Sequence, residues 1–150
     1  MGLRPDGNVP EDSYEIPIGK ARIVNEGSDI TLVGIGYTTY LCKEAAKQLN
    51  NDGYSVEVVH LLTISPMDQE TIINSVSKTR KVVIVDEDYP RCSMAGDISA
   101  LVAEQAFDYL DAPPKRVTPP HTSVPYSKPL EALYVPTVDD VIAASLEVME

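Results

Sequence analysis

Along the chain, short runs with the two-residue period of a β-strand alternate with longer runs that have the 3.6-residue period of an α-helix, which predicts alternating strands and helices. β-Strands are expected in four short apolar or alternating runs, at residues 21–24, 30–35, 56–59 and 82–85. The first two runs are separated by a turn, so we expect them to form a short antiparallel pair. A further short strand at residues 115–118 has the character of an edge strand.

Between these runs, apolar residues recur at helical spacing. The predicted helical faces carry Leu41, Ala45 and Leu49; Ile72, Ile73 and Val76; Ile98, Leu101 and Val102; and Val138, Ile142, Leu146 and Met149. Ser93 is a candidate N-cap for the third helix, and Thr137 with Asp140 forms an acidic capping-box variant for the last. The β-branched run at 82–85 is typical of a parallel strand covered by helices on both faces. The sequence therefore predicts a three-layer α/β domain.

The first part of the chain differs in composition from the rest. Residues 1–16 are rich in proline, glycine and acidic side chains, which predicts an extended lead-in or interdomain linker. Residues 17–150 are expected to form one domain, since 150 residues suffice for a single compact core. A proline-rich segment from Pro119 to Pro136 is expected to run over the surface of this domain in extended form.

Charge narrows the classes of partner. The chain has 12 Lys and Arg against 23 Asp and Glu, a formal net charge of −11, which disfavours binding to nucleic acid and to anionic membrane surfaces. No apolar run approaches the ~20 residues that span a bilayer. The N-terminus has no basic and apolar export signal, so we expect a cytoplasmic protein.

A loop with two glycines is the one candidate for anion binding. Gly34 and Gly36 lie where a predicted strand ends and a helix begins, which is where a phosphate-binding loop would lie. Thr39 occupies the place of the third glycine of that motif. A structural turn is the favoured interpretation. A stand-alone module that binds a nucleotide or phosphorylated metabolite through the Gly34–Gly36 loop remains the alternative.

Other chemically competent residues lack the neighbours that a catalytic or metal site needs. The acidic run Asp86–Asp88 has no nearby His or Asn to complete a metal shell, so we interpret it as solvated or interface charge. His60 and His121 have no evident nucleophile beside them. Cys42 and Cys92 are expected to be buried free thiols. We therefore expect no catalytic, cofactor-binding or metal-binding residue.

Two features indicate contact with partners. The proline-rich segment carries apolar side chains that are expected to divide between packing on their own domain and meeting another subunit: Tyr126, Leu130, Tyr134 and Val135. Asp111 stands in a stiff corner before Pro113, where it either terminates a helix or offers a charge to a partner.

Uncommon strings follow one another at fixed spacing along the chain. They are Ile16–Ala21, Ser65–Asp68, Ser75–Thr79, Asp86–Cys92, Phe107–Pro113 and Arg116–Thr122. Together they resemble the C-terminal domain of the beta subunit of thiamin-dependent 2-oxo acid dehydrogenases, from Gly7 to Met149. The acetoin and bacterial pyruvate dehydrogenase branch is the most similar, and the branched-chain enzymes are close to it.

The resemblance implies a transketolase C-terminal-like fold, with a five-stranded, mostly parallel mixed sheet that has one antiparallel strand. The parent oxidoreductase would decarboxylate a 2-oxo acid and transfer the acyl group to lipoyl. Thiamin diphosphate and magnesium would bind outside this fragment, so the fragment alone is expected to be inactive. The implied partners are an alpha subunit, a second beta subunit and the subunit-binding domain of the lipoyl acyltransferase. Asp111 matches an acidic position that the family uses for this last contact.

The resemblance has one departure and one open question. Relatives commonly have Asp-Leu-Arg-Thr where this chain has His60-Leu61-Leu62-Thr63, which suggests that an internal charge pair has been replaced. A chain that starts with Met1 just before a linker is expected to be either a domain cut from a longer subunit or the product of a split gene.

Overall fold

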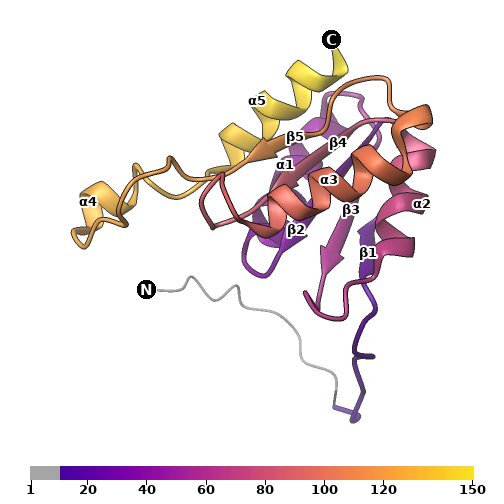
Figure 1. Ribbon diagram of the computed structural model, residues 1–150, viewed down its shortest axis with the longest axis horizontal. Helices are drawn as coiled ribbons and strands as arrows, with labels where there is room; N and C mark the ends of the chain where they lie inside the picture. The colour runs from indigo at the N-terminus through magenta and orange to yellow at the C-terminus, as the bar shows by residue number, and fades with distance from the viewer. Residues whose placement is uncertain (1–10) are drawn as a thin grey trace.

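The protein was analysed as a computed structural model that describes residues 11–150, so the first ten residues of the expected lead-in lie outside the description. Its strands are β1 (Arg22–Asn25), β2 (Ile30–Ile35), β3 (Val56–Leu61), β4 (Val82–Val85) and β5 (Lys115–Val117). Its helices are α1 (Thr38–Asn51), α2 (Gln69–Thr79), α3 (Met94–Gln105), the 3₁₀ turn η1 (Phe107–Tyr109), α4 (Lys128–Glu131) and α5 (Val138–Met149). Figure 1 shows the helices around one central sheet.

The sheet confirms the expected mixed architecture and corrects one pairing. Its strand order is β1-β3-β2-β4-β5, with β1 antiparallel and the other strands parallel. The antiparallel partner of β1 is β3, so the expected pairing of β1 with β2 is wrong. The turn between β1 and β2 passes over the start of β3: a Cβ on Gly27 would lie 2.1 Å from the carbonyl carbon of Val56, and Ser28 and Asp29 both donate their N–H to the Ser55 carbonyl.

Two separate cores confirm the three-layer arrangement. On one face of the sheet, α1 and α5 cover side chains such as Leu32, Val58 and Val83. On the other face, α2 and α3 cover the alternate positions, among them Val33 and Ile84. Successive side chains of a strand point to opposite faces of the sheet. Consecutive residues of β4 therefore belong alternately to the two cores, and all four are buried because helices cover both faces.

The helix caps follow the sequence closely. Ser93 accepts a hydrogen bond from the Gly96 N–H and caps α3. Thr137 and Asp140 bond reciprocally at the start of α5, which confirms the predicted capping box. Asp68, from the Ser-Pro-Met-Asp string, caps α2 through the Thr71 N–H.

Candidate association surfaces

The Gly34–Gly36 loop is built for close packing of α1 on the sheet. A Cβ on Gly34 would lie 2.5 Å from the Cα of Thr39, so only glycine lets the first turn of α1 approach β2 this closely. The hydroxyl of Thr38 accepts the Ile35 N–H at 2.8 Å and donates to the Val85 carbonyl at 2.7 Å. One amide of the loop is therefore already bonded within the domain. The geometry favours the structural turn over the anion-binding alternative.

The acidic run after β4 is structural at its first residue. Asp86 is 7% exposed, and its carboxylate accepts the N–H groups of Ala95 at 3.0 Å and Asp88 at 3.2 Å. The expectation of a solvated or interface charge is therefore wrong for Asp86, because the first turn of α3 folds over it. Burial, with the neighbouring Asp86 charge, raises the pKa of Glu87. Among residues 11–150, no three His, Cys, Asp or Glu residues converge on a point where a metal ion could bind.

The histidines and cysteines lie apart from one another. His60 is half-buried near Arg22 and Lys43, and burial followed by these two charges lowers its pKa. The ring of His121 lies edge-on to that of Tyr89, with 5.5 Å between the ring centroids. Cys42 is a buried free thiol, as expected, and its burial raises the pKa of the thiol. Cys92 is exposed, so the expectation that both thiols are buried is wrong for it; it precedes the cap of α3 in a turn with φ of 55°.

Asp111 lies in an ion pair that joins two corners of the domain. Arg80 ends α2 in the left-handed conformation and donates from Nε and Nη2 to the two carboxylate oxygens of Asp111, at 2.7 and 2.6 Å. The Asp111 N–H in turn donates to the Arg80 carbonyl at 2.9 Å. These bonds from Arg80 lower the pKa of Asp111. The pair is about half exposed, and Phe107 and Tyr109 of η1 project into solvent beside it.

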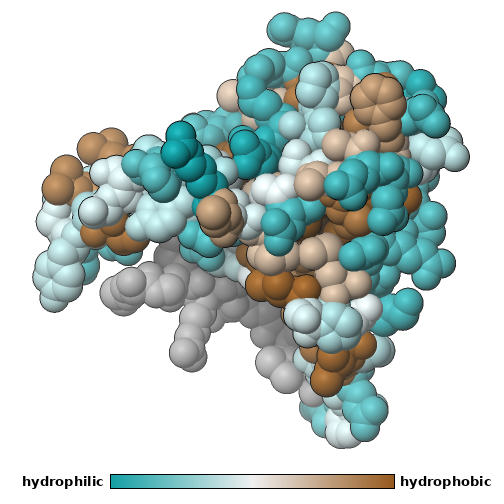
Figure 2. Space-filling model, in the orientation of Figure 1, coloured by the Kyte–Doolittle hydropathy of each residue, from teal (hydrophilic) through white to brown (hydrophobic). Residues whose placement is uncertain are grey.

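A second exposed surface is the projecting arm, which we define as residues 122–135. It leaves the domain after β5, carries α4 and returns to α5 (Figure 1). Its exposed apolar side chains are Val124, Tyr126, Leu130, Leu133 and Val135. Figure 2 shows apolar residues gathered over α4 at the tip of the molecule. Tyr134 is only 8% exposed and packs on the domain. This confirms the expectation that some apolar side chains of the segment pack on their own domain; contact of the others with another subunit stays a prediction.

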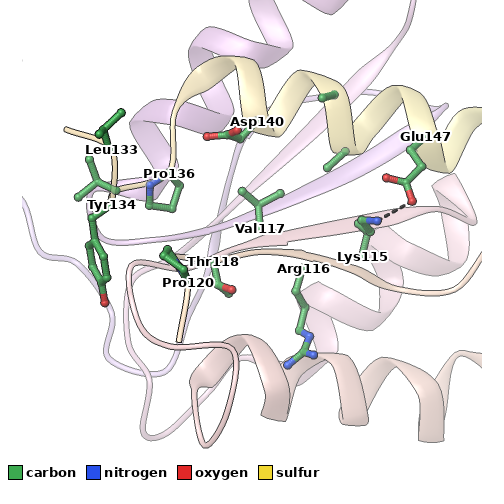
Figure 3. A pocket seen from close by; sticks show the side chains of 13 residues that line it. Lys115, Arg116, Val117, Thr118, Pro120, Leu133, Tyr134, Pro136, Asp140 and Glu147 are labelled. Atoms are coloured by element: carbon green, nitrogen blue, oxygen red, sulfur yellow. Dashed lines mark hydrogen bonds and ion pairs between the residues drawn. The ribbon is translucent and has the colours of Figure 1, made fainter. Parts of the chain in front are cut away.

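A shallow groove of about 440 Å³ lies between β5, the base of the arm and α5 (Figure 3). Its walls include Val117, Pro120, Tyr134 and Pro136. Lys115 and Glu147 form an ion pair of 2.5 Å along its rim, as the figure shows. Small-molecule sites usually place several polar groups toward one point. Here Lys115 and Glu147 neutralise each other, and residues at the base of the arm form one wall of the groove.

The string Ile16–Ala21, which follows the lead-in, is tied to the segment after β3 by two hydrogen bonds. The Gly19 N–H donates to Thr63 Oγ1 at 3.0 Å, and the Ala21 N–H donates to Asp68 at 2.9 Å. Burial works to raise the pKa of Asp68, but the hydrogen bonds from Ala21 and Thr71 outweigh it and hold the pKa low. Asp68 thus fixes both the entry of the chain and the start of α2, two roles that the sequence analysis did not predict.

These observations define a three-layer α/β domain with exposed apolar side chains on η1 and along the arm, and with a half-exposed ion pair between Arg80 and Asp111. No helix in the described part of the chain is both long and apolar enough to cross a bilayer. The chain belongs to the family "Transketolase, C-terminal domain", which it matches over residues 19–141.

Among curated proteins, the chain is 49% identical over 143 residues to the beta subunit of the acetoin:2,6-dichlorophenolindophenol oxidoreductase of Bacillus subtilis, covering 95% of this chain and 42% of the relative. It is 41% identical to the mitochondrial beta subunit of the pyruvate dehydrogenase E1 component of Dictyostelium discoideum, covering 93% and 39%. It is 40% identical to the 2-oxoisovalerate dehydrogenase subunit beta of Bacillus subtilis, covering 96% and 44%. The chain therefore spans less than half the length of these relatives.

Among solved structures, the chain resembles a split gene transketolase described as an inactive beta4 tetramer. The TM-score is 0.76 at 26% identity, and the match covers 97% of this chain and 45% of that one. The shared fold confirms the transketolase C-terminal-like architecture expected from the sequence.

Proposed function

We propose that this chain is the C-terminal domain of the beta subunit of a 2-oxo acid dehydrogenase of the pyruvate, acetoin or branched-chain type. The observation that carries the proposal is its identity of 40–49% to beta subunits of three such enzymes over nearly its whole length. Its work would be subunit association and docking of the lipoyl acyltransferase. The alternative, a nucleotide or phosphate-metabolite module, has no support in these relatives.

In the proposed parent enzyme, thiamin diphosphate with magnesium would supply the decarboxylation chemistry. The described residues do not fit that group: no three His, Cys, Asp or Glu side chains converge on a metal position, Asp86 already accepts the Ala95 and Asp88 N–H groups, and the Ile35 N–H of the Gly34–Gly36 loop already donates to Thr38. The cofactor would therefore bind to other parts of the assembly, with the alpha subunit and a second beta subunit as partners.

The first test is the size of the native polypeptide in the source cell. An antibody raised against the chain should detect a protein much larger than 16.4 kDa, or a protein of that mass that co-purifies with an alpha subunit. A free-standing 16.4 kDa protein without such a partner would contradict the proposal. We also propose a cytoplasmic location, which fractionation of the same lysate tests.

The isolated chain should be catalytically silent. With thiamin diphosphate, magnesium and pyruvate or acetoin, we expect no reduction of an artificial electron acceptor above a protein-free blank, because the family resemblance places the cofactor site outside this fragment. Turnover that scales with protein concentration, survives a further purification step and is absent from a mock preparation would contradict this expectation.

Docking of the acyltransferase should depend on Asp111. Replacing Asp111 with lysine reverses a half-exposed charge and should weaken binding of the subunit-binding domain tenfold or more at low salt, measured by calorimetry. Asp111→Asn, which keeps the shape of the side chain beside Arg80, should weaken it less. Asp108→Lys makes the same change in net charge on exposed η1 and is the matched control. Docking that is unchanged by Asp111→Lys would remove Asp111 from the contact.

A further inference from the structure

We propose that the groove between strand β1 and helix α1 binds an extended acidic segment of a partner protein, which adds a strand to the sheet beside β1. This goes beyond the proposed function, because Asp111 lies beside α2, across the sheet from α1, and its charge requires a basic partner. The groove has a volume of about 280 Å³. We call it the basic groove; its walls are Val24, Asn25, Lys43, Lys47, Asn50 and Asn51.

Positive charge gathers along this side of a strongly acidic chain. Lys43 and Lys47 are exposed and lie one turn apart on α1, and the exposed Arg22 is the cross-strand partner of His60. Within residues 11–150, no ion pair includes Arg22, Lys43 or Lys47. Burial, followed by the charges of Arg22 and Lys43, lowers the pKa of His60, so both cations act on the same ring. On a chain with a net charge of −11, this local excess of positive charge favours an anionic partner.

The donors of the basic groove are spread along it. The Asn50 Oδ1 accepts the Val56 N–H at 3.1 Å, which leaves the Asn50 amide to donate elsewhere, and Asn51 is exposed beside it. From Lys43 to Asn51 the groove follows about 12 Å of α1. Small-molecule sites are usually larger, about 300–1,000 Å³, and place a few polar groups around one ligand. The row of donors therefore fits several carboxylates on a polypeptide better than a single anion.

Strand β1 offers an open sheet edge next to these donors. Its neighbour in the sheet is β3, and no described strand covers its other side. Such an edge accepts an added extended segment. Val58 belongs to the core under α1, so His60 and its partner Arg22 face the same side of the sheet. Ile23 pairs with Val59 of the other core, so it faces the opposite side, where it is 39% exposed.

These two faces define the partner segment. Because alternate side chains of an added strand point to the same face, the segment needs acidic residues toward Lys43 and Lys47 and apolar residues toward Ile23. Alternate side chains of a strand are about 6.8 Å apart, close to the ~6 Å between positions one helical turn apart. Successive carboxylates can therefore each reach a lysine. A charge on an edge strand also protects against aggregation, which accounts for Arg22 but not for the lysines on α1.

A fluorescently labelled peptide of alternating glutamate and valine is the probe. We expect it to bind the isolated chain at low salt with Kd on the order of 100 µM by fluorescence anisotropy, because exposed ion pairs are individually weak. A peptide of the same composition, with the glutamates in one block and the valines in another, should bind at least fivefold more weakly. Hydrogen exchange of the β1 amides should slow when the alternating peptide is bound.

Charge reversal on α1 tests the position of the contact. Lys47→Glu should weaken binding of the alternating peptide about five- to tenfold, because one attractive pair becomes repulsive. Lys128→Glu makes the same change in net charge on exposed α4 and is the matched control, with Kd expected within about twofold of the wild type. Circular dichroism should show the same fold in both variants.

Three results would overturn the proposal. Equal binding of the alternating and block peptides, or unchanged exchange of the β1 amides, would exclude strand addition. Equal effects of Lys47→Glu and Lys128→Glu would show that net charge sets the affinity and that the basic groove is not the site. A single-stranded oligonucleotide of equal charge that displaced the peptide at a lower concentration than the peptide itself would assign the groove to phosphates. None of these results depends on the mass of the native polypeptide, which tests the proposed function.

Discussion

Replacing Gly34 with alanine is expected to lower the free energy of unfolding by about 3 kcal/mol, roughly 10 °C in melting temperature. The added Cβ would lie 2.5 Å from the Cα of Thr39 and 2.7 Å from its nitrogen. Both atoms belong to the backbone of α1, so no side-chain rotation can relieve the contact. The helix would have to move away from β2 and open the core beneath it. Urea titration at neutral pH measures the loss.

Gly36 provides the matched control in the same loop. A Cβ there meets no atom within 4 Å, but its φ of 57° lies in the left-handed region. Gly36→Ala should therefore cost only about 1 kcal/mol, the strain of a non-glycine residue in that conformation. If the two substitutions had equal effects, the close approach of α1 to β2 would not be the reason for glycine at residue 34.

The comparison of the two glycines shows what a local pattern can reveal. The position of Gly34 between strand and helix was visible in the sequence, and the structural turn was the favoured interpretation. Periodicity also placed the strands, α1, α2, α3, α5 and the cap of α5, because those features depend on neighbours a few residues apart. It missed α4, which lies in the segment 119–136 that was expected to be extended throughout. The strand order was not predicted; the family resemblance implied only a five-stranded mixed sheet with one antiparallel strand.

Features that depend on distant contacts were missed or misjudged. The pairing of β1 with β3 follows from the path of the chain over Val56, which no property of residues 25–28 reveals. Asp86 stands in an acidic run, which predicts a solvent-exposed side chain. It is buried because the first turn of α3 folds over it. For the exposed surfaces, the arm and Asp111 were both predicted to be relevant, but the bidentate pairing of Asp111 with Arg80 was not.

Glu57 is the clearest example of a missed residue. It interrupts a strand of apolar residues and is fully buried, and α2 covers it with Ser75 and Lys78. A charge inside a strand that must be covered on both faces, followed by Ser and Lys three positions apart on a helix, is a signal that could have found it. Ser75 Oγ donates to Glu57 at 2.5 Å, and the Lys78 ammonium pairs with the other carboxylate oxygen. Thr31 and Thr79 continue the network at 2.6 Å from each other.

Removing the cation from this pair should be strongly destabilising. Lys78→Met leaves the buried carboxylate of Glu57 without its charged partner, and we expect a loss of about 3 kcal/mol at pH near 7 by urea titration. Lys115→Met is the matched control, because the Glu147 partner of Lys115 is 63% exposed and stays solvated when the pair is broken. If both variants lost the same small amount of unfolding free energy, we would conclude that water reaches Glu57 and that its pair with Lys78 behaves as a surface contact.

A double variant separates the loss of the ion pair between Lys78 and Glu57 from the cost of leaving the Glu57 carboxylate buried and unpaired. Adding Glu57→Gln to Lys78→Met removes the uncompensated charge and keeps an acceptor for Ser75, so the double variant should be more stable than Lys78→Met alone.

The hydrogen bond to Glu57 raises the pKa of Lys78. The stabilisation is therefore complete below the ordinary lysine pKa of about 10.4 and is lost as the pH rises through the higher folded-state value. The difference between wild type and Lys78→Met should persist from neutral pH to about pH 10 and narrow above it. A difference that narrowed already near neutral pH would show that another group, and not the Lys78 ammonium, holds the buried carboxylate.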